Sequence, residues 1–285
     1  MKAFQAEFRV STMARVLGVS RQGFYAWCRR EPSERATTDV LLLAEIRRLH
    51  QASRGLYGAC RIHAQLRRNG WRVGKKRVAR LMILAGIRGV MRQGYKPTTV
   101  RNKQERPAPD LVNRAFHAEA PDLLWVADIT EIPTRSGKLR LATVLDVFSR
   151  RIVGFAMDTH MESTLAQRAL QEALTARKPI QVIHHSDQGS QYTAKAFREL
   201  AAATDVQVSM GSVGDCYDNA MAESFFATLE HELLRLKTFW TPEQARKEVF
   251  DFIAGFYNTS RLHSKIGYRT PAEMDALHQS MRAAA

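Results

Sequence analysis

From residue 116 onward, apolar residues occur in short runs that are separated by polar, turn-like residues. Three such runs cover Leu123–Ile132, Leu139–Phe148 and Ile152–Met157. Short apolar runs with tight turns between them predict three successive antiparallel strands. Helical spacing then predicts a helix over Glu162–Arg177, and a further apolar run predicts a buried strand at Ile180–Ile183.

The same alternation of patterns continues toward the C-terminus. Helical spacing covers Ala194–Ala203 and Asn219–Leu236, and a short strand is expected between them at Val206–Ser209. Another helix is expected over Pro242–Phe256, because proline is well tolerated at a helix start. Three strands followed by helix, strand, helix, strand and helix predict an α/β fold, in which helices cover a mixed sheet.

The first thirty residues have the pattern of two short helices. Thr12–Leu17 suits a helix, Gly18 suits a tight turn, and Ser20 is a good N-cap for a helix from Arg21 onward. A generic helical hairpin has this pattern, and so does a helix-turn-helix, whose second helix enters the major groove of DNA with its N-terminal residues. On the second interpretation, the residues that face DNA are Arg21, Gln22 and Tyr25.

A second helical unit is expected after a polar linker at Glu31–Asp39. Val40–Gln51 is amphipathic, and residues 53–89 suit another pair of helices that break at Asn69-Gly70. This pair again resembles a helix-turn-helix. Its second helix carries basic residues at its start, whose phosphate contacts would make DNA binding dependent on salt: Lys75, Lys76, Arg77 and Arg80.

Basic residues are concentrated in the first part of the chain. Residues 1–110 hold 24 Lys and Arg against 7 Asp and Glu, whereas residues 111–285 hold 19 against 21. A strongly basic region beside a near-neutral one indicates a nucleic-acid-binding part joined to something else, although a solvated basic surface has the same composition. Residues 92–110 are basic and proline-containing, and are expected to be a linker that can lie along DNA.

Cysteine and histidine usage excludes several classes of protein. Cys28, Cys60 and Cys216 form no CxxC pair, which indicates a reducing compartment. The spacing of His50, Cys60 and His63 matches no common zinc finger. No signal peptide and no apolar run long enough to span a bilayer is evident, so we expect a cytoplasmic protein without a membrane partner.

Three acidic residues lie at positions where a charge is costly or where active-site residues often occur. Asp128 lies in the middle of the first apolar strand, where a charge needs a partner or a metal ion. Asp187 follows the end of another strand, and Glu223 lies in the first turns of a helix. Three converging carboxylates can hold two Mg²⁺ ions, which serve in-line phosphoryl transfer. These residues alone therefore predict a metal-dependent nucleotidyl-transfer site.

Other polar residues near these acids are expected to be structural. Asp146 is expected to pair with Arg150 or Arg151. Glu131 follows Asp128 by an odd offset along a strand, so its side chain should point to the opposite face of the sheet. Structural or supporting roles are also expected for the acids before the Glu223 helix and the histidines at the strand end: Asp215, Asp218, His184 and His185.

Several long motifs occur in one order along the chain. They read LLWVADITEI, LATVLDVFSRRIVGF, VIHHSDQGSQY, GDCYDNAMAESFFATLEHELL and YNTSRLHSKIGYRTPAEM. By these motifs the chain resembles the DDE transposase and retroviral integrase superfamily. The likeness is greatest to the transposase that the second reading frame (OrfB) of the insertion-sequence-three family encodes, and it covers nearly the whole chain.

The resemblance implies a fold, a reaction and its partners. The fold would be a ribonuclease H-like mixed five-stranded sheet flanked by helices (the integrase catalytic core), preceded by an all-α helix-turn-helix region. Asp128, Asp187 and Glu223 would be the catalytic triad and bind two Mg²⁺ ions, with Mn²⁺ as a substitute. The enzyme would cut double-stranded DNA at the element's terminal inverted repeats to free a 3′-OH, then join that end to target DNA. Self-association and a first-frame (OrfA) partner or fusion would accompany this activity.

One position departs from the family pattern. Seven residues after the catalytic glutamate, many relatives have Lys or Arg facing DNA, but this chain has Glu230. Arg235 or Lys237 would have to replace that contact. Two other functions remain open from the sequence: a DNA-binding regulator of transposition without catalysis, which would need none of the three acids, and a ribonuclease acting on RNA–DNA hybrids.

Patterns and resemblance together divide the chain into five parts. The C-terminal tail is expected to be a loop with turns at Gly267 and Pro271. The parts are a helix-turn-helix segment (1–35), a second helical DNA-binding segment (36–91), a basic linker (92–115), the catalytic core (116–238) and a C-terminal helix and tail (239–285).

Overall fold

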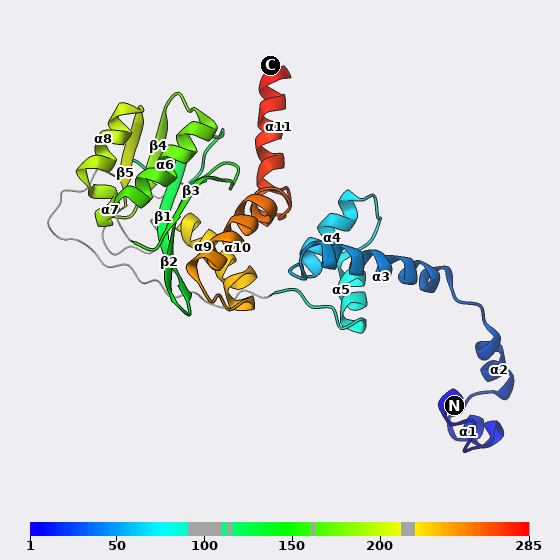
Figure 1. Ribbon diagram of the computed structural model, residues 1–285. Coiled ribbons are helices and arrows are strands. Elements are labelled where there is room, and N and C mark those ends of the chain that lie inside the picture. Colours follow the sequence, from blue (N-terminus) through cyan, green and yellow to red (C-terminus); the bar gives the residue numbers. More distant parts are fainter. Residues whose placement is uncertain (91–109, 113–115, 161–162, 212–219, 285) are drawn as a thin grey trace.

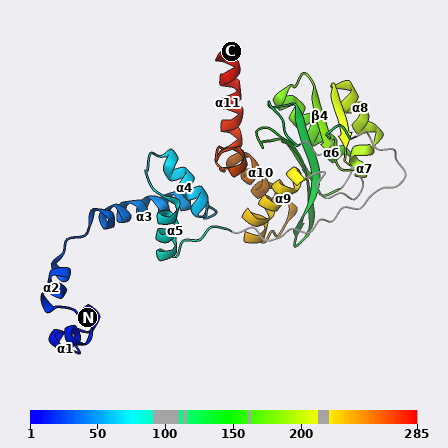
Figure 2. The ribbon, with the colours of Figure 1, turned by 180° about the vertical axis from the view of Figure 1, so that it is seen from behind.

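Figure 1 shows a computed structural model of the chain, which describes residues 1–90, 110–112, 116–160, 163–211 and 220–284. Two helical units form its N-terminal part and an α/β core forms the rest. Figure 2 shows from behind that the second helical unit lies beside the C-terminal helices of the core, away from the first unit. The basic linker predicted at residues 92–110 falls almost wholly outside the described residues.

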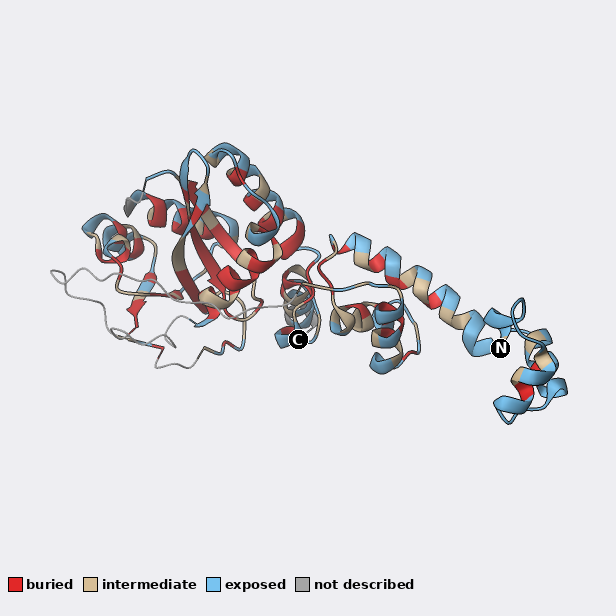
Figure 3. Ribbon diagram, turned by 90° about the horizontal axis from the view of Figure 1, so that it is seen from below, coloured by how far each residue is buried: buried red, intermediate tan, exposed pale blue. Residues whose placement is uncertain are grey.

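The first unit consists of three short helical segments. They are η1 (Lys2–Phe4), α1 (Val10–Val16) and α2 (Arg21–Arg29). The predicted turn and cap are confirmed: Gly18 has a φ of 65°, and the Ser20 Oγ accepts a hydrogen bond of 2.9 Å from the Gly23 N–H. The unit has little core of its own (Figure 3), since its buried hydrophobic residues are Ala14 and Phe24.

The second unit consists of α3 (Glu34–Ala52), α4 (Ala59–Arg68) and α5 (Lys75–Leu84). Its break at Asn69-Gly70 is confirmed, with Gly70 at a φ of 86°. Most of the predicted linker Glu31–Asp39 is wrong, because helix α3 already begins at Glu34. The Ser33 Oγ accepts a hydrogen bond from the Ala36 N–H at 3.2 Å and so caps a polar first turn that has no apolar periodicity.

Five strands form one mixed sheet. They are β1 (Leu124–Thr134), β2 (Gly137–Asp146), β3 (Ile152–Asp158), β4 (Val182–Ser186) and β5 (Val206–Met210). Their order is β3-β2-β1-β4-β5, with β1–β2 and β2–β3 antiparallel and β1–β4 and β4–β5 parallel. The predicted mixed sheet and its first three strands are therefore confirmed, and β1 lies at the centre.

Strand β4 is displaced from its predicted place. It begins at Val182 rather than Ile180, whose side chain is 95% exposed, and it runs through two histidines to Ser186. These polar residues are buried because β4 is paired on both edges, by β1 and β5. An apolar run alone could not show this. The displacement keeps Asp187 directly after the end of the strand.

Helices cover both faces of the sheet. On one face lie α6 (Ser163–Arg177), α7 (Ser190–Thr193) and α8 (Lys195–Ala203), packed against alternate strand residues such as Ala127 and Val144. Helix α6 approaches closely at Gly154, where a Cβ atom would lie 2.3 Å from the Ala169 carbonyl oxygen. On the other face, α9 (Ala220–Glu232) and α10 (Pro242–Phe252) pack against Val126 and its neighbours.

The C-terminal region holds more helix than its pattern predicts. Helix α9 ends at Glu232 and is followed by a 3₁₀ turn, η2 (Leu234–Leu236), while α10 continues as a π-helical turn, η3 (Ile253–Tyr257). Beyond η4 (Ser264–Ile266) the tail was predicted to be a loop, but α11 (Pro271–Ala284) is helical. Pro271 is its first residue, where a missing N–H costs no hydrogen bond. The turn at Gly267 is confirmed, with a φ of 68°.

Helix α4 and the residues just before it are docked on the C-terminal region through polar contacts. The Tyr57 hydroxyl accepts a hydrogen bond from the Leu262 N–H at 2.8 Å and donates one to the Ser260 carbonyl oxygen at 2.9 Å. Arg61 lies 3.1 Å from the Glu232 carboxylate. Residues from both ends of the chain therefore share one interface. Within the described ranges, no helix combines the length and apolar character that crossing a membrane requires.

Candidate active site

The three predicted acids lie on three neighbouring elements. Asp128 is on the central strand β1, at an even offset from Val126, and so points to the face that α9 covers. The β1–β4 register pairs Val126 with His185, so its continuation brings Asp187 beside Asp128. Glu223 is in the first turn of α9. Sheet pairing and helix packing thus bring residues far apart in the sequence to one end of β4.

These three acids carry like charges in a partly buried place. Protein atoms surround Asp128, although part of its surface stays accessible, and desolvation together with the negative charges of Asp187 and Glu223 raises its pKa to about 8. The Ile129 N–H donates to its Oδ1 at 2.7 Å and opposes that shift. Burial also raises the pKa values of Asp187 and Glu223. Three partly buried acids, one of them repelled by the other two, form an electrostatic environment that a bound cation relieves.

The loop after β4 holds Asp187 through its backbone. The Gly189 N–H donates a hydrogen bond to the Asp187 Oδ1 at 3.0 Å. A Cβ atom at Gly189 would lie 2.9 Å from the same oxygen, so a side chain there would crowd the carboxylate. The Gln188 side chain ties the loop to β5 by donating to the Gly211 carbonyl oxygen at 2.8 Å.

The acids are neighbours but do not form a closed ligand set. Among the residues that the structure describes, no three His, Cys, Asp or Glu side chains are gathered closely enough to hold a metal ion. To ligate one cation together, Asp128, Asp187 and Glu223 would therefore have to move toward a common centre.

Asp146 does not pair with Arg150 or Arg151, so that prediction is wrong. Its carboxylate accepts hydrogen bonds from the Ser149 N–H at 2.8 Å and the Ser149 hydroxyl at 2.7 Å, and another from the Asp122 N–H at 2.8 Å. The tight turn after β2 brings both Ser149 donors to the carboxylate, and the Asp122 N–H reaches it from the segment before β1. Arg151 instead pairs with Asp275 of α11 at 2.9 Å.

The other polar residues near the site have structural surroundings. Glu131 pairs with Lys138 at 2.7 Å and with Arg140 at 2.9 Å across the β1–β2 hairpin, as a structural role predicts. The His185 Nδ1 lies 2.9 Å from the Ser209 hydroxyl on β5, and His184 is buried. Asp215 and Asp218 lie outside the described residues.

Sequence analysis overlooked Tyr192, five residues after Asp187. It is only 2% exposed, and its hydroxyl has no hydrogen-bond partner among the residues described. The tyrosine within the DQGSQY motif was a signal, but nothing in the sequence distinguishes a buried hydroxyl from an exposed one.

The predicted DNA-contacting residues fall into two groups. Arg21, Gln22 and Tyr25 are exposed at the start of α2 and line one shallow hollow on the first unit. Lys75 and Lys76 are exposed at the start of α5. In the same helix, two guanidinium groups share a carboxylate of α3: Arg77 and Arg80 lie 2.6 and 2.5 Å from Asp39.

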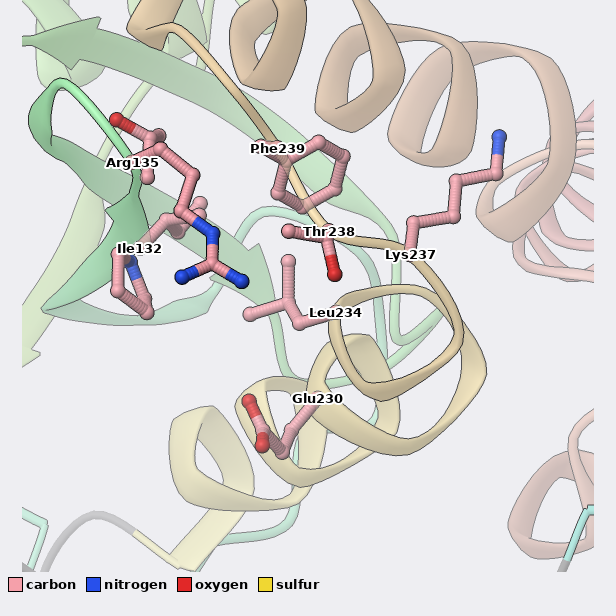
Figure 4. A pocket seen from close by; sticks show the side chains of 9 residues that line it. Ile132, Arg135, Glu230, Leu234, Lys237, Thr238 and Phe239 are labelled. Atoms are coloured by element: carbon pink, nitrogen blue, oxygen red, sulfur yellow. The ribbon is translucent and has the colours of Figure 1, made fainter.

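A cleft lies beside the C-terminal half of α9 (Figure 4). The β1–β2 hairpin forms one side, and α9, η2 and the segment after η2 form the other. Arg135 and Glu230 point toward its centre from opposite sides. Neither proposed substitute for the missing cation is free, because Arg235 pairs with Glu230 at 3.0 Å and Lys237 with Glu248 at 2.5 Å.

Comparison with known proteins agrees with this architecture. Two family models described as "Integrase core domain" match residues 118–216 and 204–271, and one described as "HTH-like domain" matches residues 38–95. The transposase InsF for insertion sequence IS3A of Escherichia coli is 36% identical over 278 residues, which cover 95% of each chain. The chain belongs to the IS3 family of transposases.

Further relatives extend the same assignment. The transposase for insertion sequence element IS629 of Shigella sonnei is 39% identical over 243 residues, covering 85% of this chain and 81% of that protein. The insertion element IS600 uncharacterized 31 kDa protein of the same species is 39% identical over 272 residues, covering 95% and 100%. The IS3-family fold is thus a ribonuclease H-like integrase core preceded by an HTH-like domain, which corresponds to α3–α5.

Among solved structures, the HTLV-2 integrase catalytic core domain in complex with magnesium is 16% identical. It aligns with a TM-score of 0.42 and covers 56% of this chain and 99% of that chain. A likeness this distant adds nothing to the assignment, which rests on the transposase sequences.

Proposed function

We propose that this IS3-family protein cuts DNA at the ends of its insertion sequence and joins the freed 3′ ends to target DNA. Asp128, Asp187 and Glu223 are its catalytic residues. The observation that carries the proposal is the approach of three acids on β1, the β4 loop and α9, where burial, together with the negative charges of Asp187 and Glu223, raises the pKa of Asp128 to about 8. Acids that lie close together with raised pKa values are typical of a site that binds cations.

The donor set fits Mg²⁺, with Mn²⁺ as a substitute. Carboxylate oxygens are the preferred ligands of both ions, and a mutually repelling acidic group gains stability from a divalent cation. Two bound ions would supply activation of the attacking oxygen and stabilisation of the leaving oxygen.

The protein's own contribution is position and charge. Pairing with β2 places Asp128, backbone N–H donors orient the carboxylates of Asp128 and Asp187, and Glu223 comes from a helix that packs on β1. In the first step water attacks a phosphodiester bond and the 3′-OH leaves with a proton. In the second step the oxygen of that 3′-OH attacks a target phosphodiester, a new P–O bond forms, and the target's own 3′-oxygen leaves with the proton. Both steps use one site, so the chain has to hold two DNA segments in turn.

The helical units are the proposed DNA-binding parts. Lys75 and Lys76 of α5 and Arg21 of α2 are exposed cations in a region with a strong basic excess. The substrates are the element's terminal inverted repeats and the target duplex, in the bacterial cytoplasm at the nucleoid. Joining two ends requires self-association, and a first-frame partner or fusion would supply further contacts.

The decisive test is a cleavage and joining assay on labelled DNA that carries the element's own ends, with Mg²⁺. Wild type should nick and join, whereas Glu223→Gln should bind the same DNA and do neither. Mg²⁺-dependent cleavage by Glu223→Gln would refute the assignment. Binding without cutting by wild type, alone and fused to the first-frame protein, would favour the regulator.

Asp39→Asn is expected to strengthen DNA binding, because it releases Arg77 and Arg80 on the basic helix α5. Each released cation that reaches a phosphate steepens the dependence of log K on log salt concentration by about 0.9. Stability should fall by about 1–3 kcal/mol, because the Asp39 and Arg77 side chains are only 17% and 24% exposed and two charge-assisted hydrogen bonds are weakened. Fluorescence anisotropy across a salt series measures the affinity for DNA and the salt slope. An unchanged slope would mean that this side of α5 does not face DNA.

Glu230→Lys is expected to raise affinity for DNA ends. The substitution places a cation beside the cleft of α9 and also releases Arg235. The salt slope should steepen by about 1 to 2. Glu199→Lys is the control, because Glu199 pairs with Lys195 on α8, over the opposite face of the sheet. Equal effects of the two variants would show that net charge, rather than this cleft, determines the gain.

A further inference from the structure

The cleft between the β1–β2 hairpin and α9 contains one cation that no acid neutralises. Residues 130–140 and 230–239 border this cleft and carry five Lys and Arg residues. Four of these five are held in ion pairs with carboxylates: Lys138, Arg140, Arg235 and Lys237. The fifth is Arg135, whose guanidinium forms no ion pair or hydrogen bond within the part of the chain that the structure describes.

The hairpin tip that carries Arg135 is fixed to the chain on the other side of the cleft. The Arg135 N–H donates a hydrogen bond to the Phe239 carbonyl oxygen at 3.0 Å, and the Ser136 N–H donates one to the Trp240 carbonyl oxygen at 3.0 Å. From this backbone the Arg135 side chain points toward the centre of the cleft, opposite Glu230 (Figure 4). A ligand therefore has to order one side chain and no loop, which lowers the entropy cost of binding.

The cleft borders the same two elements, β1 and α9, that carry two of the proposed catalytic acids. Arg135 follows Asp128 by seven residues, just past the end of β1, and Glu230 follows Glu223 by seven residues along α9. Seven residues span about 10 Å on a helix and about 23 Å on a strand. DNA rises about 3.4 Å per nucleotide, so the cleft lies about three to seven nucleotides from a phosphate bound at the acids.

The lining of the cleft suits an anionic phosphodiester. Its volume is about 340 Å³, the size of a small-ligand pocket. Apolar side chains line much of it: Ile132, Leu234 and Phe239. Apolar walls strengthen the attraction between a guanidinium and an anion, and the planar guanidinium matches two phosphate oxygens. The Glu230 carboxylate on the opposite side would repel a phosphate, but its pair with Arg235 at 3.0 Å compensates that charge.

We propose that this cleft binds a backbone phosphate of the element's DNA through Arg135. The Arg135 guanidinium donates two hydrogen bonds to one phosphate, about three to seven nucleotides from the bond that is cut. This proposal rests on the proposed function, because the strand that crosses the cleft is the one whose cleaved phosphate lies at the acids. Arg135 is then a DNA-binding residue of the core itself, separate from the helical units.

The first test measures binding of the full chain to labelled duplex DNA that carries the element's end, in EDTA so that no strand is cut. Arg135→Gln should lower the slope of log K against log salt concentration by about 0.9 and weaken binding by at least about 3-fold. Its melting temperature should equal that of wild type, because the guanidinium contacts no described partner. Arg198→Gln is the matched control, since it removes an exposed arginine from α8, over the opposite face of the sheet.

Neutral methylphosphonates in the DNA locate the contact. One phosphate at a time is replaced, up to about seven nucleotides from the cleavage position. At the phosphate that Arg135 contacts, the replacement should weaken binding of wild type by about 3-fold and leave binding of Arg135→Gln unchanged, because the same contact cannot be lost twice. Arg198→Gln should respond to every replacement as wild type does.

Three results would overturn the proposal. Equal salt slopes for Arg135→Gln and Arg198→Gln would show that net charge alone matters. The same conclusion follows if every methylphosphonate weakens Arg135→Gln as much as wild type. A change in self-association of Arg135→Gln by light scattering without DNA, together with a wild-type salt slope, would assign the cleft to a second copy of the chain.

The cleavage assay with Mg²⁺ keeps this proposal apart from the proposed function. If wild type cuts the DNA end while Arg135→Gln binds it with the wild-type slope, only the phosphate contact is wrong. If Arg135→Gln shows the expected loss but wild type cuts nothing, the phosphate contact stands and the catalytic proposal falls. If wild type does not bind the DNA end, both proposals fall.

Discussion

Asp128→Asn is expected to abolish DNA cleavage and, at the same time, to stabilise the metal-free protein. Loss of a carboxylate that positions the reaction should lower the cleavage rate by at least about 10³-fold. The neutral amide also removes the cost of burying a charge and, in second place, the repulsion from Asp187 and Glu223. Without metal at pH 8, the free energy of unfolding of Asp128→Asn should exceed that of wild type by about 1–3 kcal/mol.

The stability gain should depend on pH in a defined direction. The pKa of Asp128 is about 8 in the folded protein, against 3.8 for the free side chain. Folding therefore favours the protonated acid. The contribution of Asp128 to wild-type stability is greatest below about pH 4 and falls as the pH rises toward 8. Asp128→Asn has no ionisable group at this position, so its stability does not fall for this reason. Thermal unfolding in EDTA from pH 5 to 8 should show the two proteins diverging.

Asp146→Asn is the control for this experiment. Asp146 is also buried, with a pKa raised by burial to about 6, but its oxygens accept three hydrogen bonds. Replacing it should destabilise the protein and leave the catalytic chemistry in place. If Asp128→Asn instead lowers stability at pH 8, Asp128 has a structural partner and the electrostatic argument for the site is lost.

Glu232→Gln is expected to have the largest effect on stability. The Glu232 carboxylate accepts from Arg261 at 2.7 Å and from Arg61 at 3.1 Å, at the interface between α4 and the core. Glu232 and Arg261 are almost fully buried. Removing one member of a buried ion pair leaves a charge without compensation, which costs about 3–5 kcal/mol. Urea unfolding measures this loss.

The same helix provides the matched control. Glu230→Gln breaks an exposed pair with Arg235 and should cost less than about 1 kcal/mol. Burial alone would raise the pKa of Glu232, but hydrogen bonds and charge from Arg261 and Arg61 outweigh it and keep that pKa below its usual value. This stabilisation is present above about pH 4.5 and is lost as the pH falls further. Equal costs for both glutamine variants would mean that water reaches the buried cluster.

Local patterns predicted the sheet and the place of the acids because both depend on short-range signals. Asp187 was predicted after a strand end, and that remains true even though β4 begins two residues later than expected. Ser20 and Gly18 determine the turn between α1 and α2 by their own backbone preferences. The family motifs then pointed to Asp128, Asp187 and Glu223 together.

Contacts between distant residues could not be predicted in this way. Asp39 and Arg77 are 38 residues apart, so the basic face of α5 gave no sign that a carboxylate occupies part of it. Arg61 and Glu232 are 171 residues apart. The partners of Asp146 depend on the exact shape of a turn, and the unpartnered Tyr192 hydroxyl depends on packing in three dimensions. Charge and periodicity contain none of this information.

The contact between α4 and the C-terminal region also has a consequence during protein synthesis. Tyr57 and Arg61 are made early, but their partners Ser260 and Leu262 leave the ribosome more than two hundred residues later. Chains fold from the N-terminus as they emerge. The HTH-like unit therefore docks only after residue 262 has emerged, and a polypeptide released before residue 260 carries all three acids without a fixed DNA-binding unit.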